Sequence, residues 1–170
     1  AELPERYAAA ESFGAGGRLV VPGLIDCHTH LAFAGWRAEE FEARILGKTY
    51  LEIAAAGGGI ARTVSLTREA SVESLVTRSL EFLAELPALG VTTIECKSGY
   101  GLSVEAELKQ LAAYRELARR SPLDIVPTFL GAHTVPQEYK SRRTDYLDLV
   151  VDEMLPAVAA DRLARFCDIF

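Results

Sequence analysis

The chain has 170 residues, of which 49% are hydrophobic and 25% charged, so it is long enough for one globular domain and is not disordered. Its net charge of −6, from 18 basic and 24 acidic residues, excludes the basic surface of a nucleic-acid-binding protein. The sequence shows no signal peptide and no apolar run of membrane length. We therefore expect a cytoplasmic protein with a small-molecule ligand and neither nucleic acid nor membrane as a partner.

The first half of the chain predicts one strand and two helices. Residues 1–18 are rich in Ala, Gly and Glu and are interpreted as a linker or a remnant of a separate small domain. The β-branched and apolar residues of 18–33 predict a strand, and helical spacing predicts a helix over 38–59 that ends at three glycines. A stronger helix is predicted to begin after Ser71, a residue type that caps helices, and to end by Gly90.

The second half alternates in the same way. Residues 91–101 predict a strand, and an amphipathic helix is expected from Ser103 to Ser121, with Ser103 as its N-cap. Residues 123–135 predict another strand, and a helix is expected from 137 until Pro156. A last strand covers 166–170. Strands that alternate with helices in this way indicate a parallel α/β fold.

The three cysteines of the chain are odd in number and widely spaced: Cys27, Cys96 and Cys167. This pattern favours neither a disulfide framework nor a zinc ribbon. Because each cysteine ends or interrupts an apolar run, we expect three buried free thiols in a reducing compartment.

Polar residues gather where the predicted strands end. His28 and His30 follow the first strand, Lys97 to Tyr100 the second, and His133 the third. In parallel α/β folds the carboxyl ends of the strands form one edge, where ligands bind. The sequence therefore predicts that these three strand ends form one site.

The pair His28 and His30 is the strongest indication of a metal. Residues i and i+2 of a strand point to the same face, so both imidazoles can reach one ion, and imidazole suits zinc, iron, nickel or copper. Asp26 shares this face and is either an outer-sphere acceptor or the acceptor of a structural hydrogen bond. Two histidines supply only part of a catalytic metal site, which needs at least three protein ligands.

Three further side chains are candidates for substrate contact. Arg37 offers paired donors to a carboxylate, although the residues alone favour a surface ion pair with Glu39 or Glu40. Tyr100 lies between two glycines and either reaches into a cleft or packs at the rim. His133 follows Gly131 and Ala132 and contacts a ligand, caps a helix or is purely structural.

Ordered sequence blocks add a resemblance to these arguments. The segments "PGLIDCHTHLAFAGWRAEEFE", "GGGIARTV", "GVTTIECKSGYGL", "TFLGAHTVPQEY" and "DLVVDEMLP" resemble the amidohydrolase superfamily and, within it, the imidazolonepropionase family of histidine degradation. The blocks run in order from residue 21 to the C-terminus and cover about nine-tenths of the chain.

The resemblance implies a metal-dependent hydrolase built on a (β/α)₈ TIM barrel with one zinc or iron ion. The implied reaction is the opening of 4-imidazolone-5-propanoate by water to N-formimidoyl-L-glutamate. His28 and His30 would be metal ligands, Arg37 would hold the propionate of the substrate, and Tyr100 and His133 would contact the substrate. The superfamily's bridging carbamylated lysine is not assigned to Lys97, because the family resembles the single-metal branch.

The chain matches about the first half of such a barrel, with 19–170 as the N-terminal half and 1–18 as the remnant of a small β-sandwich domain. The remaining metal ligands and the catalytic acid or base are expected beyond Phe170. We therefore expect no hydrolase activity from this chain alone, and self-association, as a homodimer for example, through its open edges. The alternatives are another amidohydrolase, acting on a cyclic amide or a nucleobase, and a non-catalytic half-barrel module.

Overall fold

The computed structural model describes residues 13–170 and contains one four-stranded parallel sheet in the order β1-β2-β3-β4. The strands are β1 (Leu24–Thr29), β2 (Val91–Lys97), β3 (Asp124–Ala132) and β4 (Phe166–Ile169). Strand order follows chain order, so every right-handed crossover places its helix on the same face of the sheet. A curled sheet with helices outside is the arrangement of a partial barrel, whereas a doubly wound sheet reverses its order.

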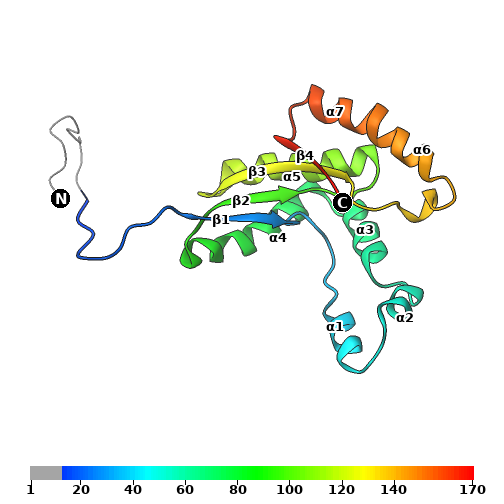
Figure 1. The fold of residues 1–170 in the computed structure, drawn as a ribbon, viewed down its shortest axis with the longest axis horizontal. Helices are drawn as coiled ribbons and strands as arrows, with labels where there is room; N and C mark the ends of the chain where they lie inside the picture. The colour runs from blue at the N-terminus through cyan, green and yellow to red at the C-terminus, as the bar shows by residue number, and fades with distance from the viewer. Residues whose placement is uncertain (1–12) are drawn as a thin grey trace.

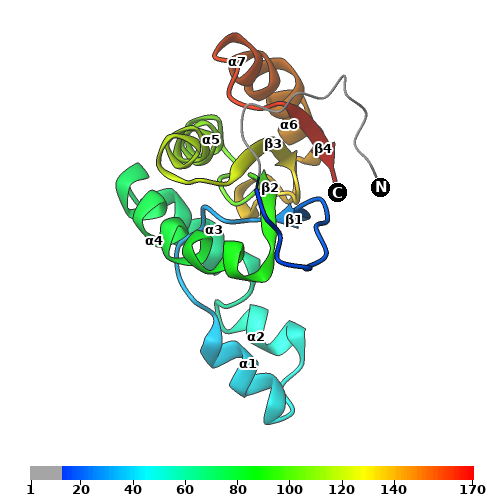
Figure 2. The same cartoon turned by 90° about the vertical axis from the view of Figure 1, so that its left-hand side faces the viewer.

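The helices are α1 (Ala38–Ile45), α2 (Tyr50–Ala55), α3 (Ile60–Glu69), α4 (Val72–Glu85), α5 (Val104–Arg120), α6 (Arg143–Asp148) and α7 (Leu155–Ala160). Short 3₁₀ turns cover Leu86–Leu89 and Gln137–Tyr139, and a π-helical segment covers Leu149–Met154. Figure 1 shows α1 and α2 extending away from the sheet, and Figure 2 shows α4, α5 and α7 packed along its outer side.

Two predicted helix starts are confirmed. The Ser71 side chain accepts from the backbone N–H of Ser74, and Ser103 accepts from that of Ala106, so each serine satisfies one free donor at the start of α4 or α5. Because these two helices cover the outer face of the sheet, their local starts also determine where the core forms.

The single helix predicted over 38–59 is wrong, because two shorter helices occupy this segment. Helix α1 ends before Gly47, whose φ of +92° a right-handed helix does not allow. Helix α2 starts again at Thr49, where a capping box with Glu52 satisfies the first N–H groups. The apolar residues whose spacing predicted this helix are also largely exposed, and Ile53 is the one residue of α1 and α2 that is buried. Helix α3 was not predicted.

The predicted helix end at Pro156 is also wrong, since α7 continues to Ala160. Proline lacks an N–H and its ring crowds the carbonyl four residues earlier, which normally ends a helix. Here the π-helical turn over Leu149–Met154 directly precedes α7 and widens the backbone before the ring. The proline therefore occupies the first turn of α7, where its missing donor costs little.

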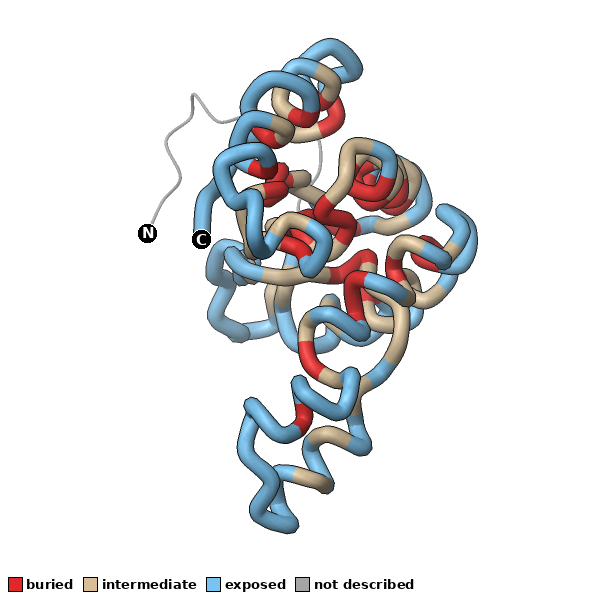
Figure 3. The backbone as a smooth tube through the Cα atoms, turned by 90° about the vertical axis from the view of Figure 1, so that its right-hand side faces the viewer, coloured by how far each residue is buried: buried red, intermediate tan, exposed pale blue. Residues whose placement is uncertain are grey.

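The core lies between the outer face of the sheet and α4, α5 and the segment from α6 to α7, as the buried residues in Figure 3 show. Strand β1 is not covered in this way, with Leu24 57% and Ile25 67% exposed. The expectation of three buried thiols is correspondingly wrong. All three cysteines are free, but only Cys96 is buried, while Cys27 and Cys167 lie exposed on the outermost strands β1 and β4.

The N-terminal linker or remnant predicted over 1–18 lies mostly outside the described residues, and 13–23 form neither helix nor strand. Within residues 13–170, no helix is long and apolar enough to cross a membrane.

Candidate functional site

The predicted meeting of three strand ends is confirmed. His28 is the penultimate residue of β1 and His30 lies one residue beyond the strand, whereas Tyr100 follows β2 and His133 follows β3. The His30 ring lies 4.7 Å from the centroids of both Tyr100 and His133, and 5.6 Å from that of His28. Residues far apart in sequence therefore form one aromatic cluster at the carboxyl edge of the sheet.

His30 is the most perturbed member of this cluster. Burial, followed by the neighbouring His133 and His28, lowers the pKa of His30 to about 4, so the ring is neutral at neutral pH. Its Nδ1 is buried and has no hydrogen-bond partner. A neutral imidazole with an unpaired buried nitrogen fits the role of a metal ligand. Among the described residues, no group of three or more His, Cys, Asp or Glu side chains is placed to hold an ion.

Arg37 borders a cleft of about 610 Å³ that His30 and Tyr100 also line, together with Trp36. The guanidinium lies 3.5 Å from the Glu40 carboxylate, so the ion pair expected as one of the two roles of Arg37 is formed. Glu40 is anchored in turn, because its other oxygen accepts from the Gly59 N–H at 2.8 Å. The triple-glycine segment thus holds Glu40, and Glu40 holds Arg37 at the cleft. His28 and His133 do not line this cleft.

His133 packs flat against His30, with 16° between the ring planes, and its Nδ1 lies 2.9 Å from the Gly99 carbonyl oxygen. Gly99 has a φ of +106°, and a Cβ there would lie 2.8 Å from the His133 Cβ. Glycine is therefore required for this close approach. Burial raises the pKa of the Tyr100 hydroxyl beside the same turn, so the phenol stays protonated.

A fully buried carboxylate shapes the turn that carries Tyr100. Glu107, in the first turn of α5, accepts hydrogen bonds from the backbone N–H groups of Gly99, Gly101 and Leu102. Burial raises the pKa of Glu107 although these donors favour its charged form. Leu102 has a φ of +52°, a conformation that this set of hydrogen bonds holds in place.

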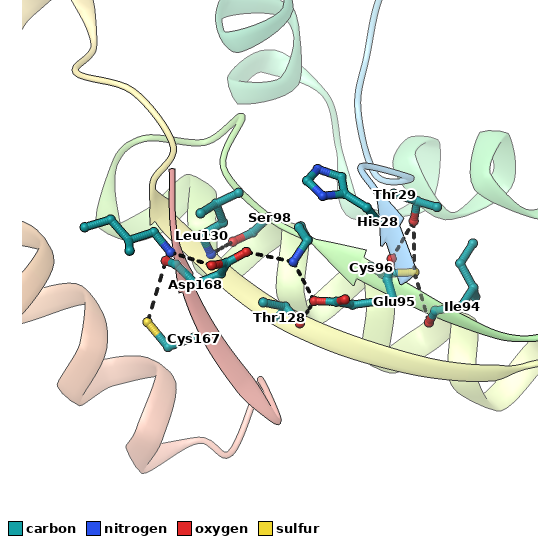
Figure 4. Close-up of polar contacts among 12 residues, drawn as sticks. His28, Thr29, Ile94, Glu95, Cys96, Ser98, Thr128, Leu130, Cys167 and Asp168 are labelled. Carbon is teal, nitrogen blue, oxygen red and sulfur yellow. Dashed lines mark hydrogen bonds and ion pairs between the residues drawn. The ribbon is translucent and has the colours of Figure 1, made fainter. Parts of the chain in front are cut away.

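The inner face of the sheet also carries a cluster of polar side chains, and Figure 4 shows Glu95, Thr128 and Asp168 of this cluster. Lys97 Nζ lies 2.6 Å from a Glu95 oxygen and 2.8 Å from an Asp168 oxygen, and the Thr128 hydroxyl donates to Glu95 at 2.7 Å. Burial works against these charges, but the hydrogen bonds hold the pKa of Glu95 below and that of Lys97 above the usual values. The hydrogen bonds and ion pairs of this cluster therefore connect β2, β3 and β4.

Sequence reasoning missed the polar residues that hold the site in place. Glu107, Gln110 and Tyr114 lie on one face of α5 and are fully buried. The signal was present, because these polar side chains recur at helical spacing on the face that otherwise packs into the core. Asp26, whose role was left open, accepts one hydrogen bond within residues 13–170, from the His28 backbone N–H at 3.5 Å.

The chain forms a partial parallel α/β barrel with histidines and an arginine near the carboxyl ends of its strands, the edge at which enzymes of this architecture place their ligand sites. The chain is 62% identical over 157 residues to an imidazolonepropionase of Symbiobacterium thermophilum, 56% over 160 residues to one of Myxococcus xanthus and 50% over 154 residues to one of Alkaliphilus oremlandii. The resemblance predicted from the sequence blocks is confirmed. No protein-family model matches the chain.

These matches cover 92%, 94% and 91% of the chain but 37%, 38% and 36% of the three relatives. The chain therefore spans little more than a third of the length of the curated relatives it matches, in agreement with the predicted partial barrel.

Proposed function

We propose that this chain forms the substrate-recognition part of a metal-dependent hydrolase that opens the ring of 4-imidazolone-5-propanoate to N-formimidoyl-L-glutamate. The cleft shared by His30, Arg37 and Tyr100 carries this proposal, since it brings a candidate metal ligand and a carboxylate-binding cation to one cavity. The similarity to proteins named imidazolonepropionase supports it over another amidohydrolase or a non-catalytic module.

The substrate-binding roles follow from charge and position. Arg37 binds the propionate through paired N–H donors, and its ion pair with Glu40 sets the direction of the guanidinium. Tyr100, which lines the cleft, presents its phenol to the imidazolone ring of the substrate, and His133, whose ring lies 5.3 Å from that of Tyr100, contacts the imidazolone ring from beside the cleft. The surrounding Trp36 and Phe33 side chains complete an apolar wall.

His28 and His30 would hold one zinc or iron ion as two of its ligands, and the further ligands and the catalytic acid or base would come from later strands of a complete (β/α)₈ barrel. When bound, such an ion would lower the pKa of a water molecule and polarise the carbonyl of the substrate. The neutral state of His30 and its unpaired Nδ1 suit a ligand, because metal binding requires a deprotonated imidazole. Without the further ligands, the chain alone would show no turnover.

A chimera tests the proposal. The chain would replace the matching 157 residues of the 62% identical Symbiobacterium relative, and loss of the imidazolone absorbance would measure hydrolysis. We expect turnover from the chimera and none from the chain alone. Arg37→Lys should raise KM more than it lowers kcat, because a point charge replaces a bidentate donor.

Arg62→Lys is the matched control, since Arg62 pairs with the exposed Glu39 and does not line the cleft. It should leave both kinetic constants unchanged. A chimera that folds and binds metal but does not hydrolyse the substrate would overturn the proposed function, as would an Arg37→Lys chimera with an unchanged KM.

A further inference from the structure

The inference begins with Gln110, a fully buried side chain of α5 that faces two loops of the site. Its Nε2 donates to the Ala32 carbonyl at 2.7 Å, and its Oε1 accepts from the Tyr100 backbone N–H at 3.1 Å. A carbonyl can only accept and a backbone N–H can only donate, so the two partners leave the amide one orientation. Gln110 therefore joins the segment just after His30 to the turn that carries Tyr100.

The Tyr100 N–H belongs to the same peptide group as the Gly99 carbonyl. Fixing the N–H against Gln110 also fixes the carbonyl, which points the opposite way in a planar trans peptide. That carbonyl oxygen lies 2.9 Å from His133 Nδ1. Because the oxygen can only accept, His133 Nδ1 must carry the proton of this hydrogen bond.

The consequence concerns the second nitrogen of His133. In a neutral imidazole with a proton on Nδ1, Nε2 is an acceptor. Within residues 13–170, Nε2 of His133 makes no hydrogen bond. Neutral His133 would therefore accept a hydrogen bond from a ligand N–H and could not donate one to a ligand carbonyl.

We propose that Gln110 is a positioning residue that, through the Gly99–Tyr100 peptide, fixes neutral His133 as its Nδ1–H tautomer and leaves Nε2 to accept a ring N–H of the substrate. The substrate role rests on the proposed function, whereas the tautomer does not. Glu107 supports the same turn one peptide earlier, by accepting from the Gly99 N–H. Gln110 instead contacts the Gly99–Tyr100 peptide, whose carbonyl is hydrogen-bonded to His133.

The tautomer can be read directly because the chain has only three histidines, His28, His30 and His133. Long-range ¹H–¹⁵N spectra of the 170-residue chain at about pH 9, above the ordinary imidazole pKa of about 6.5, distinguish a protonated from an unprotonated ring nitrogen. Single histidine variants assign the three rings. We expect Nδ1 of His133 to be protonated and Nε2 unprotonated, and the reverse pattern in the wild-type chain would overturn the inference without any variant.

Variants of α5 separate positioning from a merely structural role. Gln110→Met removes both hydrogen bonds at similar volume and should shift His133 toward the Nε2–H tautomer. Gln110→Glu retains an oxygen that accepts from the Tyr100 N–H whether or not the carboxyl group is ionised, and it should keep the wild-type pattern. Tyr114→Phe is the matched control, because the Tyr114 hydroxyl contacts Lys97 O and Ala32 N and not the Gly99–Tyr100 peptide.

Tyr114→Phe should lower the melting temperature yet keep the Nδ1–H tautomer. An unchanged tautomer in a folded Gln110→Met chain would contradict the positioning role. An equal shift in Tyr114→Phe would also contradict it, since general loosening of α5 would then be the cause.

Two isosteric probes test the acceptor at Nε2. Pyrrole-2-propanoate carries a ring N–H, and furan-2-propanoate carries a ring oxygen in its place. The wild-type chain should bind the pyrrole acid about threefold to tenfold more tightly, the effect of one neutral hydrogen bond, and Gln110→Met should lose this preference. Equal binding of both acids would overturn the acceptor role. If neither acid binds, the proposed carboxylate recognition by Arg37 fails, and the spectra alone decide the tautomer.

Discussion

Replacing Tyr114 with phenylalanine should reveal how strongly α5 holds the loops of the site. Tyr114 is fully buried, and its hydroxyl donates to the Lys97 carbonyl at 2.7 Å and accepts from the Ala32 N–H at 3.2 Å. The two contacts join the end of β2 to the segment that follows His30. The substitution removes one oxygen atom and leaves the aromatic packing in place.

The expected loss follows from the two backbone groups left without partners. A net neutral hydrogen bond contributes about 1 kcal/mol, and each buried group left unpaired costs about 1–3 kcal/mol. We therefore expect the free energy of unfolding to fall by about 2–4 kcal/mol, a large part of the stability of a domain of this size. With an m-value of about 2 kcal/mol/M, the urea midpoint should fall by roughly 1–2 M.

Urea unfolding followed by far-UV circular dichroism measures this loss. Tyr139→Phe is the matched control, because within residues 13–170 the Tyr139 hydroxyl makes no hydrogen bond and its ring packs on Tyr146 and Arg142. The control should change stability by less than about 0.5 kcal/mol. Equal losses for the two variants, or a Tyr114→Phe chain as stable as the wild type, would refute the reasoning.

Three further predictions concern the sheet. Lys97→Met should lower stability by about 1.5–3 kcal/mol near neutral pH, counting only its bond to Glu95, whereas the exposed Lys140→Met should not. The lowered pKa of Glu95 stabilises the folded chain at pH values above the unfolded pKa of about 4.3, and the raised pKa of Lys97 stabilises it below the unfolded pKa of about 10.4. In urea titrations, the stability difference between the wild type and Lys97→Met should therefore shrink as pH falls below about 4 or rises above about 10. A difference that is constant with pH would contradict the ion pair. Gly99→Ala, at a φ of +106° and against the His133 Cβ, should cost about 1–3 kcal/mol and displace the His133 resonances in NMR spectra; unchanged spectra would contradict the close approach. The unpaired edges of β1 and β4 should make the chain associate with a second copy, and a single monomeric species in light scattering at all concentrations would contradict this.

The predicted strands and the helices α4 and α5 were recognisable from local signals. Alternating apolar segments indicated four parallel strands, and Ser71 and Ser103 marked two helix starts that the structure confirms. Local signals did not predict the helix boundaries where the backbone departs from regular α-helical geometry. The positive φ of Gly47 divided one predicted helix, and a π-helical turn carried another past Pro156.

The residues of the candidate site could also be predicted only in part from the sequence. The sequence by itself determined which side chains stand at the strand ends, because a strand places i and i+2 on one face and parallel strands end at one edge. His28, His30, Tyr100 and His133 could therefore be chosen before any coordinates, whereas Arg37, which lies beyond the strand, was chosen from the resemblance.

Only the tertiary structure decided how these side chains are held. The helical spacing of Gln110 and Tyr114 indicates a buried face of α5 but not their partners, because the Ala32 backbone groups that they bind lie 78 and 82 residues away in the sequence. The orientation of the Gly99–Tyr100 peptide, and with it the proton position on His133, follows from that packing. The exposure of Cys27 on β1 was likewise decided by which face the helices cover, since an apolar run is compatible with either burial or a bare edge.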